Sequence, residues 1–114
     1  MAVKSSSIVI HTSSRRLEFY NGTRLAGSYP IAIGKSQTPT PHGKYTIVSK
    51  HVNPGGVFGA CWMGLSIYGY GIHGTNNPSS IGTAASKGCI RMHNHDVENL
   101  SRSVTIGMPV VITS

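Results

Sequence analysis

The stretch Leu17-Glu18-Phe19-Tyr20-Asn21-Gly22 decides the fold class of this chain. Its apolar and polar side chains alternate, which is typical of a strand with one buried face. The Asn-Gly pair is a strong hairpin signal, because both residues tolerate the positive φ of a type I′ turn. We therefore expect residues 23–28 to return antiparallel to residues 16–20.

Further strand patterns lie on both sides of this hairpin. Segments rich in β-branched and aromatic residues predict strands at 8–10, 29–33, 44–49, 65–68, 71–73 and 110–113. One short helix is expected at 95–103, because Val97 and Leu100 share a face and Asn94 is a suitable N-cap. The predicted fold is mostly β, with β-sandwich-like mixed sheets and one short helix.

Length and composition predict a single loop-rich globular domain. The chain has 114 residues, of which 39% are apolar, 11% are charged and 14 are glycine. A chain of this length buries one core, so we expect one domain over residues 1–114. We also expect it to act as a monomer.

The charge of the chain is strongly positive. Ten Lys and Arg against three Asp and Glu give a formal charge of +7, which favours an anionic partner. The basic residues are scattered rather than clustered on one helix or arm, so nucleic-acid binding is not expected. No apolar run reaches the length of a membrane-spanning helix, and residues 1–7 lack the apolar segment of a signal peptide.

The two cysteines have different surroundings. Cys61 lies between Ala60 and Trp62, as a small buried hydrophobe would, whereas Cys89 lies among Ser, Lys, Gly and Arg. A disulfide between them is the less favoured alternative, because a domain of this size needs no such cross-link. Cys89 is the cysteine that we expect to be reactive.

The residues with catalytic potential lie in two segments, Gly71-Ile72-His73-Gly74-Thr75 and Ser86-Lys87-Gly88-Cys89-Ile90-Arg91-Met92. A neighbouring imidazole can take the proton of a thiol and then stabilise the thiolate. His73 and Cys89 are 89 − 73 = 16 positions apart, and a loop between them can bring them together. We expect Cys89 to be the nucleophile and His73 its base.

The neighbours of Cys89 fit acyl transfer. Positive charge on Lys87 and Arg91 favours the thiolate. The backbone N–H groups of Gly88 and Cys89 are candidate oxyanion-hole donors. Arg91 can bind a substrate carboxylate through two parallel hydrogen bonds.

These residues give the chain a resemblance to the L,D-transpeptidase catalytic domain, or YkuD domain, family. The family signature is a His-Gly pair and then Ser-x-Gly-Cys-x-Arg, which here reads His73-Gly74 and Ser86-Lys87-Gly88-Cys89-Ile90-Arg91. The early strands and the segment Thr38-Pro39-Thr40-Pro41-His42-Gly43 are also similar to the family. One departure is Lys87, at a position where the family often has His.

The resemblance implies an activity and a place of action. Cys89 would attack the diamino-acid carbonyl of a peptidoglycan stem tetrapeptide, release D-Ala, and pass the acyl group to an amine to form a 3→3 cross-link. Gly74 would orient His73 through its carbonyl, and Arg91, Ser86, Lys87 and Tyr70 would bind substrate. No cofactor or metal is implied, and the cell wall or periplasm is the expected compartment.

Several alternatives remain at the level of sequence. His73 and Cys89 could be ordinary core residues, or ligands of a zinc site together with His93 and His95, although the spacing of a structural finger is missing. Trp62, Tyr68 and Tyr70 are expected in the core or the cleft wall. An L,D-carboxypeptidase would use the same intermediate with water as the acceptor, and a non-catalytic basic module would bind wall polymer.

Overall fold

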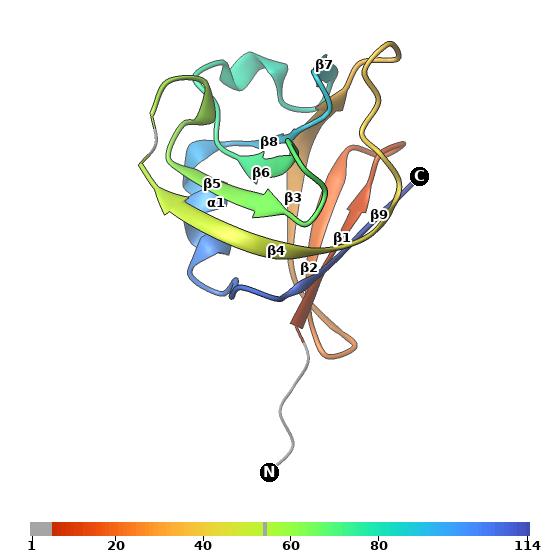
Figure 1. The fold of residues 1–114 in the computed structure, drawn as a ribbon, viewed down its shortest axis with the longest axis vertical. Coiled ribbons are helices and arrows are strands. Elements are labelled where there is room, and N and C mark those ends of the chain that lie inside the picture. Colours follow the sequence, from red (N-terminus) through yellow and green to blue (C-terminus); the bar gives the residue numbers. More distant parts are fainter. Residues whose placement is uncertain (1–5, 54) are drawn as a thin grey trace.

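The computed structural model describes residues 6–53 and 55–114. Within these residues nine strands, one α-helix and two short 3-10 helices follow one another along the chain (Figure 1). The strands are β1 (Ser6–His11), β2 (Arg16–Asn21), β3 (Arg24–Gly34), β4 (Gly43–Val52), β5 (Cys61–Leu65), β6 (Gly71–His73), β7 (Ala84–Ser86), β8 (Ile90–Met92) and β9 (Pro109–Thr113). The helices are η1 (Gly56–Phe58), η2 (Pro78–Ser80) and α1 (Asn94–Ser101).

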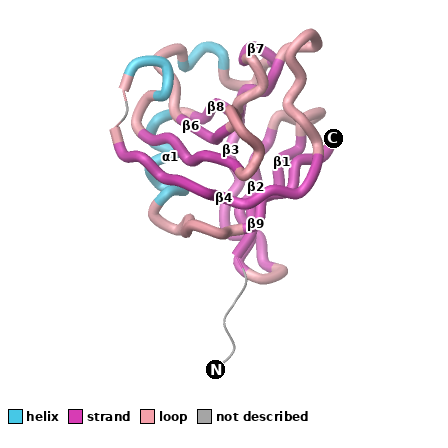
Figure 2. The backbone as a smooth tube through the Cα atoms, in the orientation of Figure 1, coloured by secondary structure: helices cyan, strands magenta, loops and turns pink. Residues whose placement is uncertain are grey.

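Two long strands, β3 and β4, join the two halves of the sheet (Figures 1 and 2). The first part of β3 pairs with β2 and its later part pairs with β8, while β4 pairs first with β9 and then with β5. The pairings β2–β1–β9 and β5–β6–β8 close a ring of strands, and β7 pairs with the end of β3. The β1–β9 and β6–β8 pairs are parallel. The prediction of a mostly β fold with mixed sheets and one short helix is confirmed.

The core lies inside this ring and under α1. Alternate residues of the strands are fully buried there, including Ile8, Ile10, Ile31, Ile47, Met63, Ile72, Ile90 and Met92, each at 0% exposure. Helix α1 packs against β5 and β6 and buries Val97 and Leu100. This is the alternation expected when one face of a sheet is removed from water.

The predicted hairpin is present, but its turn lies one residue later. Asn21 still belongs to β2 and pairs with Arg24, so Gly22 and Thr23 are the central turn residues. Gly22 has φ 66°, and neither Asn21 nor Thr23 has a positive φ. A glycine at the first central position is the pattern of a type II′ turn, so the type I′ prediction is wrong.

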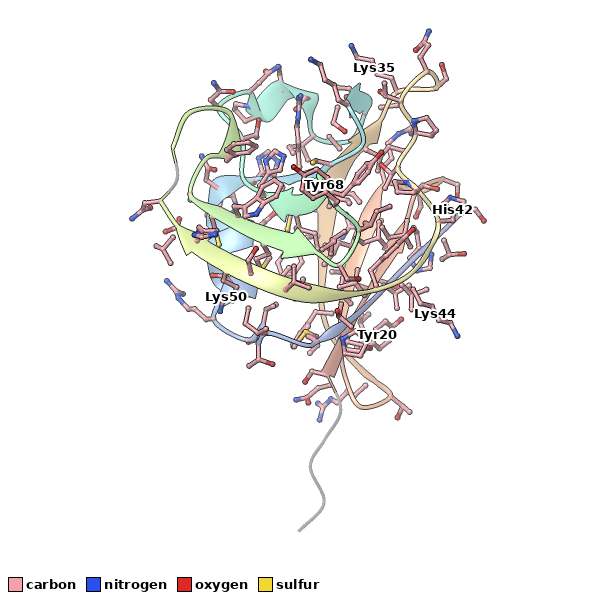
Figure 3. All side chains as sticks on the ribbon, viewed as in Figure 1. Tyr20, Lys35, His42, Lys44, Lys50 and Tyr68 are labelled. Carbon is pink, nitrogen blue, oxygen red and sulfur yellow. The ribbon has the colours of Figure 1, made fainter. Side chains whose placement is uncertain are left out.

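The strand predicted at residues 65–68 is also wrong. Strand β5 ends at Leu65, and the chain then turns, with Tyr70 N–H donating to the Ile67 carbonyl at 3.3 Å. Tyr68, expected in the core or the cleft wall, is 100% exposed (Figure 3). The strand instead covers Cys61–Leu65, and its Trp62 packs its ring over Gly71 of β6, where a Cβ would collide with it.

Helix α1 begins and ends close to the predicted bounds. It starts at Asn94, so His93 occupies the N-cap position and Asn94 does not cap the helix. At the other end, Lys50 Nζ donates to the carbonyls of Ser101 at 2.7 Å and Val104 at 2.8 Å (Figure 3). A cation on these carbonyls compensates the negative end of the helix.

The prediction that residues 1–7 contain no signal segment concerns residues that mostly lie outside the described part of the chain. Across residues 6–53 and 55–114, the search for a helix both long and apolar enough to cross a membrane found none.

Candidate active site

The pairing of β6 with β8 places the candidate catalytic residues on one face of the sheet. Ile72 lies opposite Ile90 and His73 opposite Arg91 in this parallel pair. Side chains alternate between the two faces of a strand, so His73 and Arg91 share the face opposite the core. Cys89 comes immediately before β8, two residues before Arg91, and shares that face as well.

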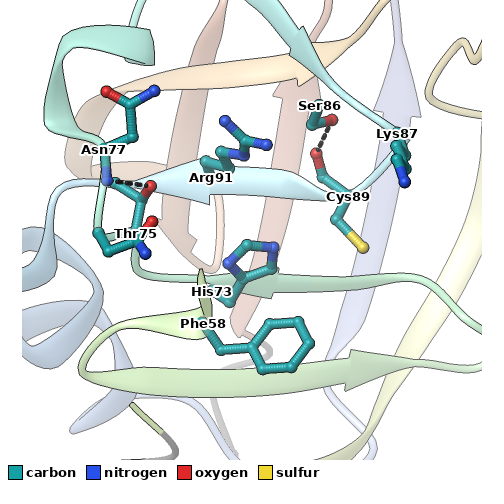
Figure 4. A pocket seen from close by; sticks show the side chains of 9 residues that line it. Phe58, His73, Thr75, Asn77, Ser86, Lys87, Cys89 and Arg91 are labelled. Carbon is teal, nitrogen blue, oxygen red and sulfur yellow. Dashed lines mark hydrogen bonds between the residues drawn. The ribbon is translucent and has the colours of Figure 1, made fainter. Parts of the chain in front are cut away.

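These side chains meet in a pocket of about 370 Å³. Its lining comprises Phe58, His73, Thr75, Asn76, Asn77, Ser86, Lys87, Cys89 and Arg91. Figure 4 shows the His73 ring lying between Arg91 and Phe58, with the Cys89 side chain beside it, and the Cys89 Sγ contacts the Gly69 carbonyl oxygen at 3.7 Å. Residues 75–77 belong to the segment after β6, so the residues that separate His73 from Cys89 in sequence form one wall of the pocket.

His73 is held in one orientation by the main chain. Its Nδ1 lies within hydrogen-bonding distance of the Gly74 carbonyl oxygen. Because a carbonyl only accepts, Nδ1 must carry the proton, which leaves Nε2 as an acceptor. The ring is 4% exposed.

Burial also sets the protonation state of His73. Desolvation lowers the pKa of His73 below its ordinary value, the hydrogen bond to Gly74 opposes this effect, and the charge of Arg91 adds to it. A buried imidazole next to a cation favours its neutral form. His73 is therefore uncharged at neutral pH, as a general base must be.

Two aromatic side chains surround the His73 ring. Trp62 stacks on it with ring centroids 5.6 Å apart, and Phe58 meets it edge-on at 5.2 Å. Trp62 lies opposite His73 in the β5–β6 pair, so the strand register produces this stack. Trp62 was expected in the core or the cleft wall, whereas Phe58 carried no signal in the sequence because its contact with His73 is made only in the folded chain.

Cys89 is half-buried, and its protonation differs from the expectation. Burial raises the pKa of the Cys89 thiol, and a backbone contact with Gly71 and the charge of Arg91 lower it only in part. Lys87 is exposed and does not contribute to this shift. The charge of Arg91 thus favours the thiolate in the predicted direction, but desolvation outweighs it in the resting protein.

Ser86 organises the turn that carries Cys89. Its Oγ donates to the Cys89 carbonyl at 2.6 Å and accepts from the Gly88 N–H at 3.0 Å. The Gly88 N–H is thus already used inside the protein, which corrects its expected role as a free oxyanion-hole donor. On the other side, Thr40 Oγ1 donates to the Gly88 carbonyl at 2.8 Å and accepts from the Gly34 N–H.

Tyr70 lies against the core, which is one of the two places expected for it. It was expected to bind substrate, but it is not among the residues that line the pocket. It packs against the core, and a Cβ on Gly88 would come 2.5 Å from its ring. Gly88 also has φ 121°, so this position requires glycine for two reasons.

Both cysteines are free, and Cys61 is buried at 1% exposure, as its surroundings predicted. Within residues 6–53 and 55–114, no three His, Cys, Asp or Glu side chains are grouped so that they could hold a metal ion.

Comparisons with known proteins agree with this geometry. The family model of the L,D-transpeptidase catalytic domain, YkuD, matches residues 5–112. The putative L,D-transpeptidase YkuD of Bacillus licheniformis is 55% identical over 106 residues, which cover 93% of this chain and 64% of that protein. The putative L,D-transpeptidase YqjB of Bacillus subtilis is 34% identical, with 93% of this chain and 70% of that protein covered.

Solved structures show the same fold. L,D-transpeptidase 3 from Mycobacterium tuberculosis matches with a TM-score of 0.88 at 20% identity, covering 97% of this chain and 62% of that one. The catalytic domain of the Enterococcus faecium L,D-transpeptidase matches with a TM-score of 0.82 at 23% identity, covering 99% and 100%. The chain belongs to the L,D-transpeptidase catalytic-domain family, which confirms the resemblance drawn from its motifs.

Proposed function

We propose that this domain is a cysteine-dependent peptidoglycan L,D-transpeptidase that forms 3→3 cross-links. The strongest support is the arrangement of His73, Cys89 and Arg91 on one face of the β6–β8 pair around a single pocket. The contact between His73 Nδ1 and the Gly74 carbonyl adds to it, because it presents Nε2 as an acceptor. The chain spans 64% of the length of the two Bacillus YkuD relatives, so the activity of the whole protein is part of this proposal.

In the first half-reaction, the donor stem peptide acylates the Cys89 thiol. His73 Nε2 takes the Sγ proton as Sγ attacks the diamino-acid carbonyl, and the Cys89 N–H stabilises the oxyanion. The carbon–nitrogen bond to D-Ala then breaks, and the imidazolium returns the proton to the leaving amine. The products are free D-Ala, a thioester on Cys89 and neutral His73.

In the second half-reaction, the side-chain amine of another stem attacks the thioester. His73 accepts a proton from this amine as the new amide bond forms. Collapse of the intermediate breaks the carbon–sulfur bond, and the imidazolium protonates Sγ. The thiol and the neutral imidazole are regenerated, which matches a resting site in which both groups are uncharged.

The other lining residues would bind the stem peptides. Arg91 carries the charge needed for a stem carboxylate, and Lys87 is exposed at the pocket rim. Ser86 contributes by holding the turn around Cys89 rather than by presenting a free hydroxyl. The +7 charge suits an anionic wall polymer, in the cell wall or periplasm, and a monomer without nucleic acid stays our expectation.

The test is the intact mass of the protein and its products after incubation with a disaccharide tetrapeptide. Wild type should give an acyl-enzyme, free D-Ala and cross-linked dimers, and Cys89→Ser and His73→Ala should give none of them at a comparable rate. Cys61→Ala is the matched control, because it removes the other thiol from the core and should keep the reaction.

The same experiment separates the rival functions. Tripeptide without any dimer would mean that water resolves the thioester, as in a carboxypeptidase. No acyl-enzyme at all would favour a non-catalytic wall-binding module. A carbapenem is a second probe, since a solved structure with this fold, that of LD transpeptidase LdtMt1, is a complex with imipenem; a Cys89 adduct is expected here.

A further inference from the structure

The side chain of Asn94 links three parts of the chain around His73. Its Oδ1 accepts hydrogen bonds from the Ala60 N–H at 3.0 Å and the Thr75 N–H at 3.1 Å. Its Nδ2 donates to the Thr75 carbonyl at 3.1 Å. All three bonds run from the first turn of α1 to loops beside the pocket, and none of them serves the helix itself.

One of these bonds acts on the group that holds His73. The Gly74 carbonyl and the Thr75 N–H belong to the same planar peptide unit. Asn94 Oδ1 accepts from the nitrogen end of this unit, and His73 Nδ1 donates to its oxygen end. The orientation of this peptide unit therefore decides whether the Gly74 carbonyl points at the imidazole. The hydrogen bond from the Thr75 N–H to Asn94 also polarises the unit and makes the Gly74 carbonyl a stronger acceptor.

The space around Asn94 Oδ1 leaves no room for a side chain at either of two neighbouring glycines. A Cβ at Gly74 would collide with Asn94 Oδ1, and so would a Cβ at Gly59. Gly74 is further tied by its own N–H, which donates to the Cys61 carbonyl at 3.0 Å. The two peptide units that flank Gly74 are thus each fixed by a neighbouring element, the 73–74 unit by β5 and the 74–75 unit by α1.

We propose that Asn94 is a positioning residue for the base, holding the 74–75 peptide unit so that the Gly74 carbonyl keeps His73 in the tautomer that presents Nε2 to Cys89. This role rests on the proposed function, in which His73 is the base. Asn94 is not itself among the residues that line the pocket, and it reaches the site through the main chain of Thr75, which does line it.

The variants that test this role are Asn94→Ala, which removes all three bonds, and Asn94→Asp, which keeps an acceptor for the Thr75 N–H. Asn99→Ala is the matched control, because Asn99 lies on the same helix and its side chain donates to the Tyr29 hydroxyl rather than to the loops around His73. Should Asn94→Ala fail to fold, Asn94→Ser replaces it, since its hydroxyl is too short to make the same three bonds.

Two measurements are made on folded protein. Nitrogen-15 NMR of the His73 ring reports which nitrogen carries the proton, and a defect in stability alone would not change it. The alkylation rate of Cys89 with iodoacetamide reports how well His73 takes up the thiol proton. We expect Asn94→Ala to populate the Nε2–H tautomer and to slow alkylation about 10- to 100-fold, while Asn94→Asp recovers most of the wild-type tautomer.

If Asn94→Ala, or Asn94→Ser in its place, has the same His73 tautomer and the same Cys89 alkylation rate as Asn99→Ala, the positioning role is overturned. Failure of the proposed function looks different, because neither measurement requires a stem peptide. If wild-type protein makes no cross-link, but Asn94→Ala still changes the His73 tautomer as expected, the transpeptidase proposal is wrong and the positioning role of Asn94 is supported.

Discussion

The two faces of β5, β6 and β8 carry opposite kinds of residue on the same strands. One face holds Cys61, Met63, Ile72, Ile90 and Met92, all at 1% exposure or less. The other face holds Trp62, His73 and Arg91, with Cys89 at the entrance to β8. Neighbouring residues in sequence thus serve the core and the pocket in turn.

This difference teaches that stability and chemistry can be separated one residue at a time. The core face is apolar and its side chains belong to the buried hydrophobic core, so a change there alters the free energy of unfolding. The pocket face presents polar groups whose protonation depends on partial burial. Substitutions one position apart should therefore have distinct effects.

The largest expected difference lies between the two thiols. Cys89 should react with iodoacetamide at least about 10³-fold faster than Cys61, because Cys61 becomes accessible only in the unfolded fraction, about 10⁻³ to 10⁻⁶ of molecules. Peptide mass mapping of the labelled protein measures both rates. In denaturant the two rates should converge, and comparable rates in the native protein would contradict the separation of the faces.

His73→Gln should lower the acylation rate about 10²- to 10⁴-fold, the usual contribution of a general base. In wild type the rate should fall on acidification only below the ordinary histidine range, because burial lowers the pKa of His73. Stopped-flow acylation over a pH series measures this limb. If the rate falls with an apparent pKa at or above the ordinary histidine value, the His73 imidazole is not desolvated.

The same lowered pKa has a consequence for stability. His73 stays neutral in the folded protein while an unfolded histidine takes up a proton, so the free energy of unfolding should fall as the pH drops from 6.5 through the folded pKa of His73. Urea titrations at neutral and acidic pH measure it. The loss should be smaller in His73→Gln, and an equal loss would assign it to other groups.

Ile72→Ala removes a fully buried side chain next to His73 and should cost about 2–5 kcal/mol of unfolding free energy. The acylation rate per folded molecule should stay near that of wild type, because Ile72 faces the core. Urea unfolding and active-site titration together test both claims. A specific loss of rate would mean that the two faces are coupled.

Lys50→Met should have the smallest effect. It removes the hydrogen bonds to the Ser101 and Val104 carbonyls and should cost about 1–2 kcal/mol, with acylation unchanged. Met keeps most of the apolar stem, so the loss reports the charged group. Thermal unfolding beside Lys44→Met, an exposed strand lysine, provides the comparison.

Much of the fold follows from local pattern. The hairpin around Gly22, the buried alternation at Ile8 and Ile10, and the short helix over Val97 and Leu100 were all predictable, because they depend on residues close in sequence. The failures were long-range. Strand β5 covers Cys61–Leu65, with Trp62 packed on Gly71, and Tyr68 is exposed because the chain turns between β5 and β6.

The sequence by itself determined the reactive groups of this protein, since a thiol, an imidazole and a guanidinium in the family spacing identify Cys89, His73 and Arg91. Only the tertiary structure decided their state. Burial keeps both Cys89 and His73 uncharged, and Ser86 takes the Gly88 N–H that the motif offered to an oxyanion. Desolvation and hydrogen bonding depend on neighbours brought together by the fold, and a linear motif does not contain them.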